Sequence, residues 1–260
     1  NGKHKKQFYL SIDFLRDVPY TPKHFLPISM DGVAEGDFTM VFGFPGRTNQ
    51  YLPSSAISQV LETLNPAKIA IRETSLKIMD KYMREDEATK IKYAAKYATI
   101  ANYWKKWIGE SMGLKQTNAL QKKLDYEADF QKRLPAGSPY KNLLIDLQKL
   151  YKDIDQYALA NDYYSEIALR NVDLTAYMAS LRRLVTAYEK NGESGYNELL
   201  PRVKSFSSEF YNDYDSSIDQ EKFGALLTMY VDKLDKKFVP EFLQRENLGM
   251  SSNESFDQMI

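Results

Sequence analysis

Apolar and polar residues recur with a helical period along most of the chain from about residue 56 onward. The clearest pattern lies in residues 86–112, where the apolar side chains fall at Tyr93, Tyr97, Ile100, Trp104 and Ile108. Spacings of three and four residues place these side chains on one face of an α-helix. We therefore predict a helix over residues 86–112, with Gly113 as a cap just past its end.

Other helices are predicted before and after this one. Residues 57–64 predict a short helix that closes at Asn65-Pro66, because the residue before a proline avoids the α region. The remaining predicted helices cover residues 67–84, 115–134, 140–170, 173–190, 196–211 and 219–238, with Asp173 as a cap and turns at 135–140 and 191–195. The pattern predicts six to eight helices with short links, packed as in a bundle, and without a repeat of fixed period.

The first 55 residues have a different character. Three prolines make "VPYTPKHFLPIS" (18–29) extended, and "MDGVAEGD" (30–37) predicts a turn. "FTMVFGF" (38–44) is aromatic and β-branched, which is typical of a short buried strand. Little else in the chain predicts a strand to pair with it. We therefore expect the rest of its sheet to lie outside this chain, and divide the chain into a β-containing part, 1–55, and a helical part, 56–260.

Composition excludes several functions. Of 260 residues, 43% are hydrophobic and 27% charged, and the 35 basic residues balance the 35 acidic ones, which argues against nucleic-acid binding. With no cysteine and two histidines, a thiolate or multi-histidine metal site is not expected. No apolar run approaches the roughly 18 residues of a membrane span. "NGKHKKQFYL" has no apolar region typical of a signal peptide.

A search for catalytic motifs finds few candidates. His24 lies between prolines and His4 in a basic end, so both are interpreted as surface or packing residues. The acidic run "REDE" (84–87) is typical of a solvated helix start. "DYDSSIDQE" (213–221) lacks the spacing of a calcium loop, and no phosphate-binding loop is present, so we expect no metal and no cofactor. The many aromatic residues favour helix packing over a sugar- or peptide-binding face.

Two segments resemble a known family. "PKHFLPISMDGVAEGDFTMVFGFPGRTNQYL" (22–52) and "YATIANYWKKWIGE" (97–110) are similar to the bacterial S46 peptidases, the dipeptidyl-peptidase 7 and 11 family. The resemblance implies a chymotrypsin-like double β-barrel with a large inserted helical domain. It makes residues 38–44 a strand of the second barrel. The fold class expected for this chain is therefore mainly α: a bundle-like helical domain with a short N-terminal β remnant of that barrel.

The resemblance also implies where catalysis takes place. In the family the catalytic histidine and aspartate precede the first segment and the serine follows the helical domain, so this chain would be an internal part, inactive alone. It would be the substrate-binding part of a serine dipeptidyl peptidase, in the periplasm or at the cell surface. A homodimer is one assembly that the parent enzyme could adopt. The alternative is a stand-alone helical module that binds peptides or proteins without catalysis.

One substrate-binding residue is implied within the chain. Asn102 matches a family asparagine that holds the free α-amino group of the peptide substrate, and Ala94, Ala95, Ala98 and Ala101 lie close by. An amide oxygen accepts a bond from an ammonium without burying a counter-charge. The alternative interpretation is that Asn102 is a core residue whose side chain is bonded to a neighbouring helix. Four further residues are expected to be structural: Trp104, Trp107, Arg47 and Asn49.

Overall fold

The computed structural model describes residues 22–25, 27–40, 42–43, 46, 49 and 51–244. The chain divides into two units, Asn1–Thr48 and Asn49–Ile260. The described residues contain helices and no strand. The mainly α prediction is therefore confirmed.

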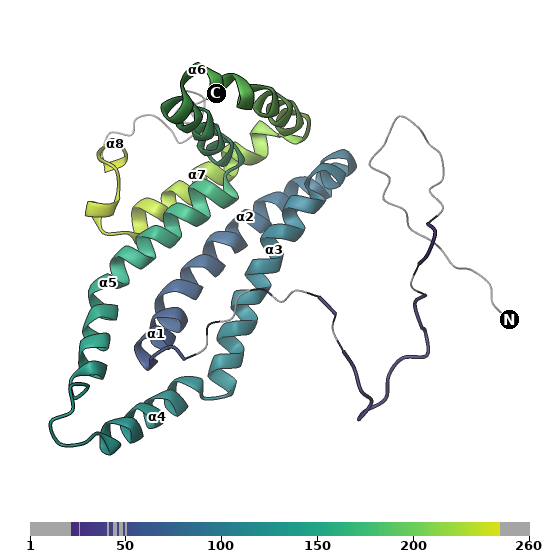
Figure 1. Cartoon of the computed structure of the whole chain (residues 1–260). Helices are drawn as coiled ribbons and strands as arrows, with labels where there is room; N and C mark the ends of the chain where they lie inside the picture. Colours follow the sequence, from purple (N-terminus) through teal and green to yellow (C-terminus); the bar gives the residue numbers. More distant parts are fainter. Residues whose placement is uncertain are drawn as a thin grey trace. The chain divides into compact units, whose positions relative to one another are not determined.

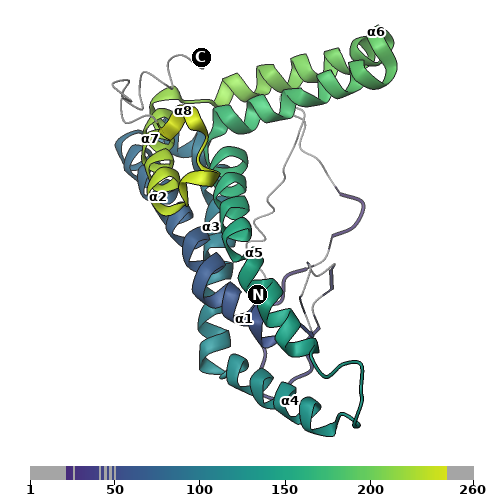
Figure 2. The ribbon, with the colours of Figure 1, turned by 90° about the vertical axis from the view of Figure 1, so that its left-hand side faces the viewer.

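The second unit contains the helices (Figure 1). In chain order they are α1 (Ser54–Gln59), the π-helical turn η1 (Val60–Leu64), α2 (Asn65–Glu85), α3 (Glu87–Gln116), α4 (Ala119–Arg133), α5 (Leu143–Glu166), the π-helical turn η2 (Ile167–Asn171), α6 (Asp173–Asp213), α7 (Ser216–Lys233), the 3-10 turn η3 (Lys236–Phe238) and α8 (Glu241–Gln244). Figures 1 and 2 show α2 lying beside α3, α5 and α7. This arrangement makes α2 the central helix of the unit.

Two groups of buried apolar side chains hold these helices together. Ile71 of α2 is fully buried with residues of α5, η2 and α7. Leu76 and Met79 of α2 pack with Tyr93 and Ile100 of α3 and with Ile218 of α7. Each large apolar side chain contributes about 1.5–3 kcal/mol when fully buried. The predicted stripe on α3 is confirmed here, since Tyr93 and Ile100 are buried and Tyr97 and Trp104 pack against the same group.

The predicted break at Asn65-Pro66 is wrong. The chain stays helical through a π-turn, in which the Asn65 N–H bonds the carbonyl oxygen of Val60, five residues earlier. Pro66 then falls in the first turn of α2, where a missing N–H costs little. The buried Asn65 side chain donates to Glu110 Oε2 and Ser111 Oγ of α3, both at 3.1 Å. This segment therefore joins α2 to α3.

The prediction that Gly113 caps the next helix is also wrong. α3 continues through Gly113 to Gln116, and the left-handed residue beyond its end is Asn118, with φ of 50°. The Thr117 N–H and hydroxyl both donate to the Gly113 carbonyl oxygen. These bonds close the last turn of the helix.

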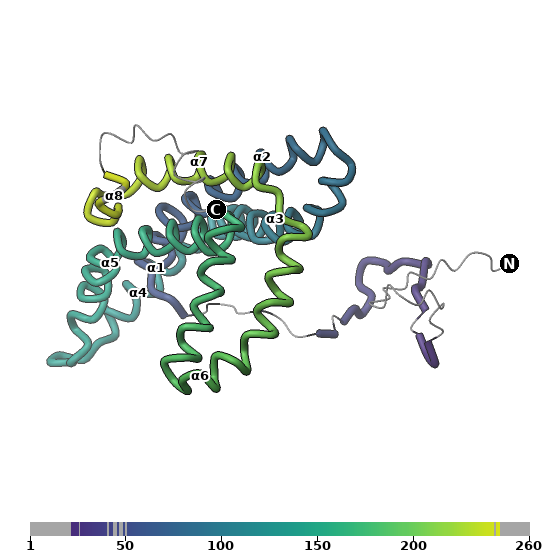
Figure 3. Tube along the Cα trace, turned by 90° about the horizontal axis from the view of Figure 1, so that it is seen from above, coloured from purple at the N-terminus to yellow at the C-terminus, as the bar shows by residue number. Residues whose placement is uncertain are grey.

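α6 is a helical hairpin, seen from the side in Figure 2 and from above in Figure 3. The turn predicted at residues 191–195 is confirmed, because Gly192 has φ of 61° and the two arms meet there. Gly195 lies so close to the other arm that a Cβ would fall 2.6 Å from the Ala187 carbonyl oxygen. Tyr177 of the first arm stacks on Phe210 of the second at 4.3 Å between ring centroids.

The first unit contains a turn and no strand in its described part. The Asp37 N–H bonds the Ala34 carbonyl oxygen at 3.1 Å, with Gly36 at φ 94° in between. This is the turn predicted at 30–37. The strand predicted at 38–44 lies partly outside the described residues. Phe38, Met40 and Phe42 are described, and they are 90%, 71% and 96% exposed.

Candidate substrate-binding face

Asn102 lies in the middle of α3, on the side facing solvent. The helix is capped by Asp86, whose Oδ2 accepts bonds from both the N–H and the hydroxyl of Thr89 at 2.7 Å. Among the described residues, nothing is hydrogen-bonded to the Asn102 side chain. The alternative interpretation of Asn102 as a core residue bonded to a neighbouring helix is therefore wrong.

Small residues precede Asn102 on this side of the helix, and exposed Lys105 and Lys106 follow it one turn later. Ala94, Ala95 and Ala98 are exposed, whereas Ala101 is buried in the core. Two turns beyond Asn102, a Cβ added at Gly109 would meet nothing within 4 Å. Exposed Ile91 and Met112 lie toward the two ends of the same helix. The outward side of α3 before Asn102 therefore leaves room for another chain to come close to a free amide.

The two tryptophans lie on the inner side of α3. Trp107 is 8% exposed, and Trp104 is half-buried with its Nε1 enclosed. Lys68 Nζ and the Arg72 guanidinium of α2 lie 4.9 and 4.8 Å from the Trp107 ring centroid. Both side chains therefore take part in the packing of α3 on α2.

A buried ion pair on the same inner side was not found from the sequence. Arg72 of α2 and Glu166 of α5 form two bonds, Nε to Oε2 at 2.6 Å and Nη2 to Oε1 at 3.2 Å. Arg72 Nη1 also donates to the carbonyl oxygen of Ile100 at 3.1 Å. One sequence signal was available: Arg72 falls in register with buried Ser75 and Met79, where an apolar residue is expected.

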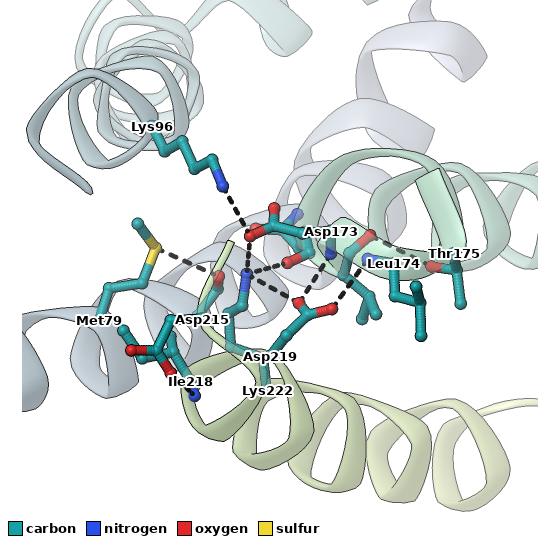
Figure 4. Close-up of polar contacts among 12 residues, drawn as sticks. Met79, Lys96, Asp173, Leu174, Thr175, Asp215, Ile218, Asp219 and Lys222 are labelled. Atoms are coloured by element: carbon teal, nitrogen blue, oxygen red, sulfur yellow. Dashed lines mark hydrogen bonds and ion pairs between the residues drawn. The ribbon is translucent and has the colours of Figure 1, made fainter. Parts of the chain in front are cut away.

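A second buried charged cluster joins α6 to the rest of the unit (Figure 4). Asp219 of α7 and Lys222 are fully buried, and Lys222 Nζ lies 3.2 Å from Asp219 Oδ1 and 3.4 Å from Asp173 Oδ2. Lys222 also donates to the Asn171 carbonyl oxygen at 2.7 Å. Lys96 of α3 pairs with Asp173 from the other side at 3.1 Å. Burial raises the pKa of Asp219, against the opposing charge of Lys222.

The acidic runs singled out in the sequence serve as helix ends. Asp86 of "REDE" caps α3, as expected for a helix start, and Asp215 of "DYDSSIDQE" accepts the N–H groups of Ser217 and Ile218 in α7. Asp219 caps α6 from across the fold, accepting the N–H groups of Asp173 and Leu174. No group of metal-binding side chains occurs within the described ranges.

The other candidates are distributed as follows. His24 and Asn49 are exposed, while His4 and Arg47 lie outside the described residues.

A groove of about 360 Å³ lies between α1, α4 and α5. Two of its polar side chains bond a third, since Gln59 Nε2 and Thr63 Oγ1 both donate to Asp155. Of the helices in the part described, none combines the length and apolar character needed to cross a membrane.

Comparison with known proteins now identifies the class of this helical domain. The profile of the Peptidase S46 family matches residues 13–260, and the chain belongs to that family.

Individual relatives are consistent with this assignment. The Asp/Glu-specific dipeptidyl-peptidase of Flavobacterium psychrophilum is 46% identical over 227 residues, which cover 86% of this chain and 32% of that protein. A protein of the same name from Capnocytophaga gingivalis is 43% identical over 244 residues, or 93% of this chain and 33% of that one. The chain therefore spans about a third of the length of these relatives.

The fold is also found in a solved structure. The crystal structure of Porphyromonas endodontalis DPP11 in complex with dipeptide Arg-Glu matches with a TM-score of 0.68 at 22% identity. The match covers 93% of this chain and 35% of that one. At this identity the likeness shows that the two share the fold.

Proposed function

We propose that this chain is the helical, substrate-binding part of a serine dipeptidyl peptidase that releases dipeptides from peptide N-termini. The observation that carries the proposal is the free, exposed amide of Asn102, which follows exposed alanines on α3, in a chain of the S46 family. A dipeptidyl peptidase must recognise the free end of its substrate. A fixed polar group at a set distance from the reacting bond performs that task.

The chemistry of Asn102 suits an α-ammonium group. An ammonium has three donors, and an amide oxygen accepts one of them without the desolvation cost of a second buried charge. Ala98 lies one turn before Asn102 and Ala95 two turns before it on the same side, and both present only methyl groups. In the proposed enzyme, a peptide terminus held at Asn102 would leave room for two residues before the scissile bond. Longer N-terminal extensions would be excluded.

The nucleophile, base and orienting acid would be supplied by a chymotrypsin-like barrel elsewhere in the longer enzyme, and this chain alone would not hydrolyse peptides. Residues 38–44 would form one strand of that barrel. The support is the exposure of Phe38, Met40 and Phe42, which are apolar side chains of a kind that strands bury. They would be covered when their partner strands are present.

Two further properties are proposed for the longer enzyme. Its substrates would carry Asp or Glu at the second position, because the relatives from Flavobacterium psychrophilum and Capnocytophaga gingivalis are both named Asp/Glu-specific. It would act in the periplasm or at the cell surface, as the family resemblance implies.

The stand-alone binding module is the competing function, and the groove between α1, α4 and α5 is the place for it. In that groove Asp155 is bonded by Gln59 and Thr63, while Glu62, Gln148 and Lys152 also line it. The peptidase proposal accounts for both Asn102 and residues 38–44, which the module does not use.

The test is a product analysis of the full-length protein that contains this stretch. A peptide with a free amino terminus and Glu at position two should yield a dipeptide by mass spectrometry. The same peptide N-acetylated should stay intact, and a serine-directed fluorophosphonate should abolish cleavage. Cleavage of the acetylated peptide at a similar rate, or no cleavage of either, would contradict the proposal.

A further inference from the structure

Arg72 makes three directional contacts from a buried position in α2. Arg72 is only 5% exposed. Its forked guanidinium holds Glu166, the last residue of α5, through two nitrogens. The third nitrogen, Nη1, donates to the carbonyl oxygen of Ile100 in the middle of α3 at 3.1 Å. A single side chain therefore fixes α2, α5 and α3 relative to one another.

The contacts of Arg72 on α3 extend over two turns. Besides Ile100, the guanidinium carbon lies 5.2 Å from the Tyr103 ring centroid and 4.8 Å from that of Trp107. Spacings of three and four residues place these three contacts on one side of the helix. Asn102 lies within this stretch but projects to solvent. Arg72 thus holds the segment of α3 that carries Asn102, from the side opposite the amide.

Stability alone does not account for such an arrangement. A buried ion pair contributes little net stability over a well-packed apolar pair, because both charges must be desolvated. Its specific property is direction, since the planar guanidinium bonds only in a fixed geometry. A carbonyl in a helix has a second lone pair, so Ile100 accepts from Arg72 without losing its helical bond. The bond therefore restrains both rotation and sliding of α3.

Glu166 is itself held in place by neighbouring polar groups. Asn171, at the end of η2, donates from Nδ2 to the Glu166 carbonyl oxygen at 2.8 Å and lies 3.5 Å from Oε2. Lys222 of α7 in turn donates to the Asn171 carbonyl oxygen. The carboxylate that orients Arg72 therefore has little freedom to turn.

We propose that Arg72, oriented by Glu166, is a positioning residue for substrate: it holds α3 so that Asn102 meets the ammonium of the peptide. This inference rests on the proposed function of Asn102. Binding groups work within about 0.5 Å of their productive position, and a shift of 1 Å can cost on the order of 100-fold in rate. A helix that rolled or slid by that amount would lose the amino terminus while remaining folded.

The experiment removes the bonds while keeping the packing. In the full-length protein, the double variant Arg72→Met/Glu166→Leu replaces the ion pair with apolar side chains. We expect a melting temperature close to that of the unsubstituted protein, because such replacements are often neutral. For a peptide with a free amino terminus we expect KM to rise and kcat/KM to fall by about 10- to 100-fold.

A matched control replaces the other α2–α5 ion pair. Lys68 Nζ lies 3.3 Å from Asp162 Oδ2 and also approaches Trp107, but it bonds no carbonyl of α3. Lys68→Met/Asp162→Leu should leave kcat/KM within about twofold of the value for the unsubstituted protein. This is expected because neither residue bonds the segment of α3 that carries Asn102. An equal loss in this control would overturn the positioning role, because any change at the α2–α5 contact would then do the same.

A double-mutant cycle with Asn102→Ala tests whether Arg72 acts through Asn102. In the Asn102→Ala background, the Arg72→Met/Glu166→Leu change should lower kcat/KM by no more than about twofold. The full 10- to 100-fold loss in that background would overturn the inference, as would no loss in the unsubstituted background. An Asn102→Ala variant with unchanged kinetics would instead overturn the proposed function, so the two failures are distinguishable.

A single variant covers the case in which the double variant does not fold. Arg72→Lys keeps a positive charge facing Glu166 but has one nitrogen in place of the fork, so Ile100 loses its donor. We expect a folded protein with a raised KM for free-amino peptides and an unchanged pattern of products. An unchanged KM in Arg72→Lys would overturn the inference.

Discussion

The carboxylate of Asp219 in α7 accepts a hydrogen bond from the main-chain nitrogen of Asp173, the first residue of α6, at 2.7 Å. Its second oxygen accepts from Leu174 at 2.8 Å. α6 is thus capped by a residue 46 positions along the chain, on another helix. Because Lys222 neutralises the same carboxylate, the start of the α6 hairpin and the body of the unit are joined by one buried cluster.

Replacing Asp219 should therefore be costly. Asp219→Ala would leave two N–H groups without an acceptor and the buried Lys222 with only Asp173 as counter-charge. We expect a loss of about 3–5 kcal/mol in the free energy of unfolding, typical of a broken buried pair. The control is Asp215→Ala, which removes the cap of α7 itself and should cost about 1 kcal/mol. Urea denaturation measures both, and equal losses would contradict the role given to Asp219.

The core around α2 makes a second prediction. Ile71 is fully buried, so Ile71→Ala should lower the free energy of unfolding by about 2–5 kcal/mol. Ile91→Ala, on the neighbouring helix, removes the same atoms from a side chain that is 74% exposed, and should change stability by less than about 0.5 kcal/mol. Similar thermal shifts for the two variants would show that the packing described here is wrong.

Glu221 gives a pH-dependent prediction. Its Oε2 accepts from Lys81 Nζ and from the Tyr82 hydroxyl, both at 2.8 Å, and the bond from Lys81 is the main cause that lowers the pKa of Glu221. A lowered pKa stabilises the fold above the ordinary value of 4.5, and this contribution disappears as pH falls through the lower folded value. The pair is half-exposed, so the contribution is at most about 1 kcal/mol.

The measurement is urea stability of Glu221→Gln and of the unsubstituted protein from pH 7 to pH 3. The variant should be less stable at pH 7, and the two curves should converge in acid. A constant difference across this range would show that the Lys81 and Tyr82 bonds do not favour the charged form of Glu221.

Much of this fold could be predicted from one sequence, and the reason is local. The long apolar stripe of α3 and the turn at Gly192 depend on residues within one or two helical turns of each other. The errors have non-local causes. Pro66 stays within a helical run because a π-turn precedes it, and Asp173 was expected to cap α6 whereas Asp219 does so.

The candidate site shows the same division. Asn102 was identified through the family resemblance, and the periodicity of α3 placed Tyr93 and Ile100 inward and left Asn102 outside. Arg72 and Glu166 are 94 positions apart, and nothing in the sequence alone pairs them. Such a pair becomes visible only once α2, α3 and α5 are packed together.

Residues 38–43 test the proposed relation to a β-barrel. In this 260-residue chain the amides of Phe38, Thr39 and Met40 should exchange with solvent rapidly, because no strand pairs with them in the described part. In the full-length enzyme the same amides should exchange slowly, as in a paired strand. Hydrogen exchange with mass spectrometry follows both. Slow exchange in this chain alone would favour the stand-alone binding module.

The most direct test of the central claim is the kinetics of Asn102→Ala in the full-length enzyme, beside Asn161→Ala. Asn161 is an exposed asparagine within the C-terminal part of α5, and so matches the change in composition and exposure. We predict that Asn102→Ala raises KM and lowers kcat/KM for free-amino peptides by the equivalent of about 1–3 kcal/mol, while Asn161→Ala has no effect. Equal kcat/KM for the two variants would contradict the account.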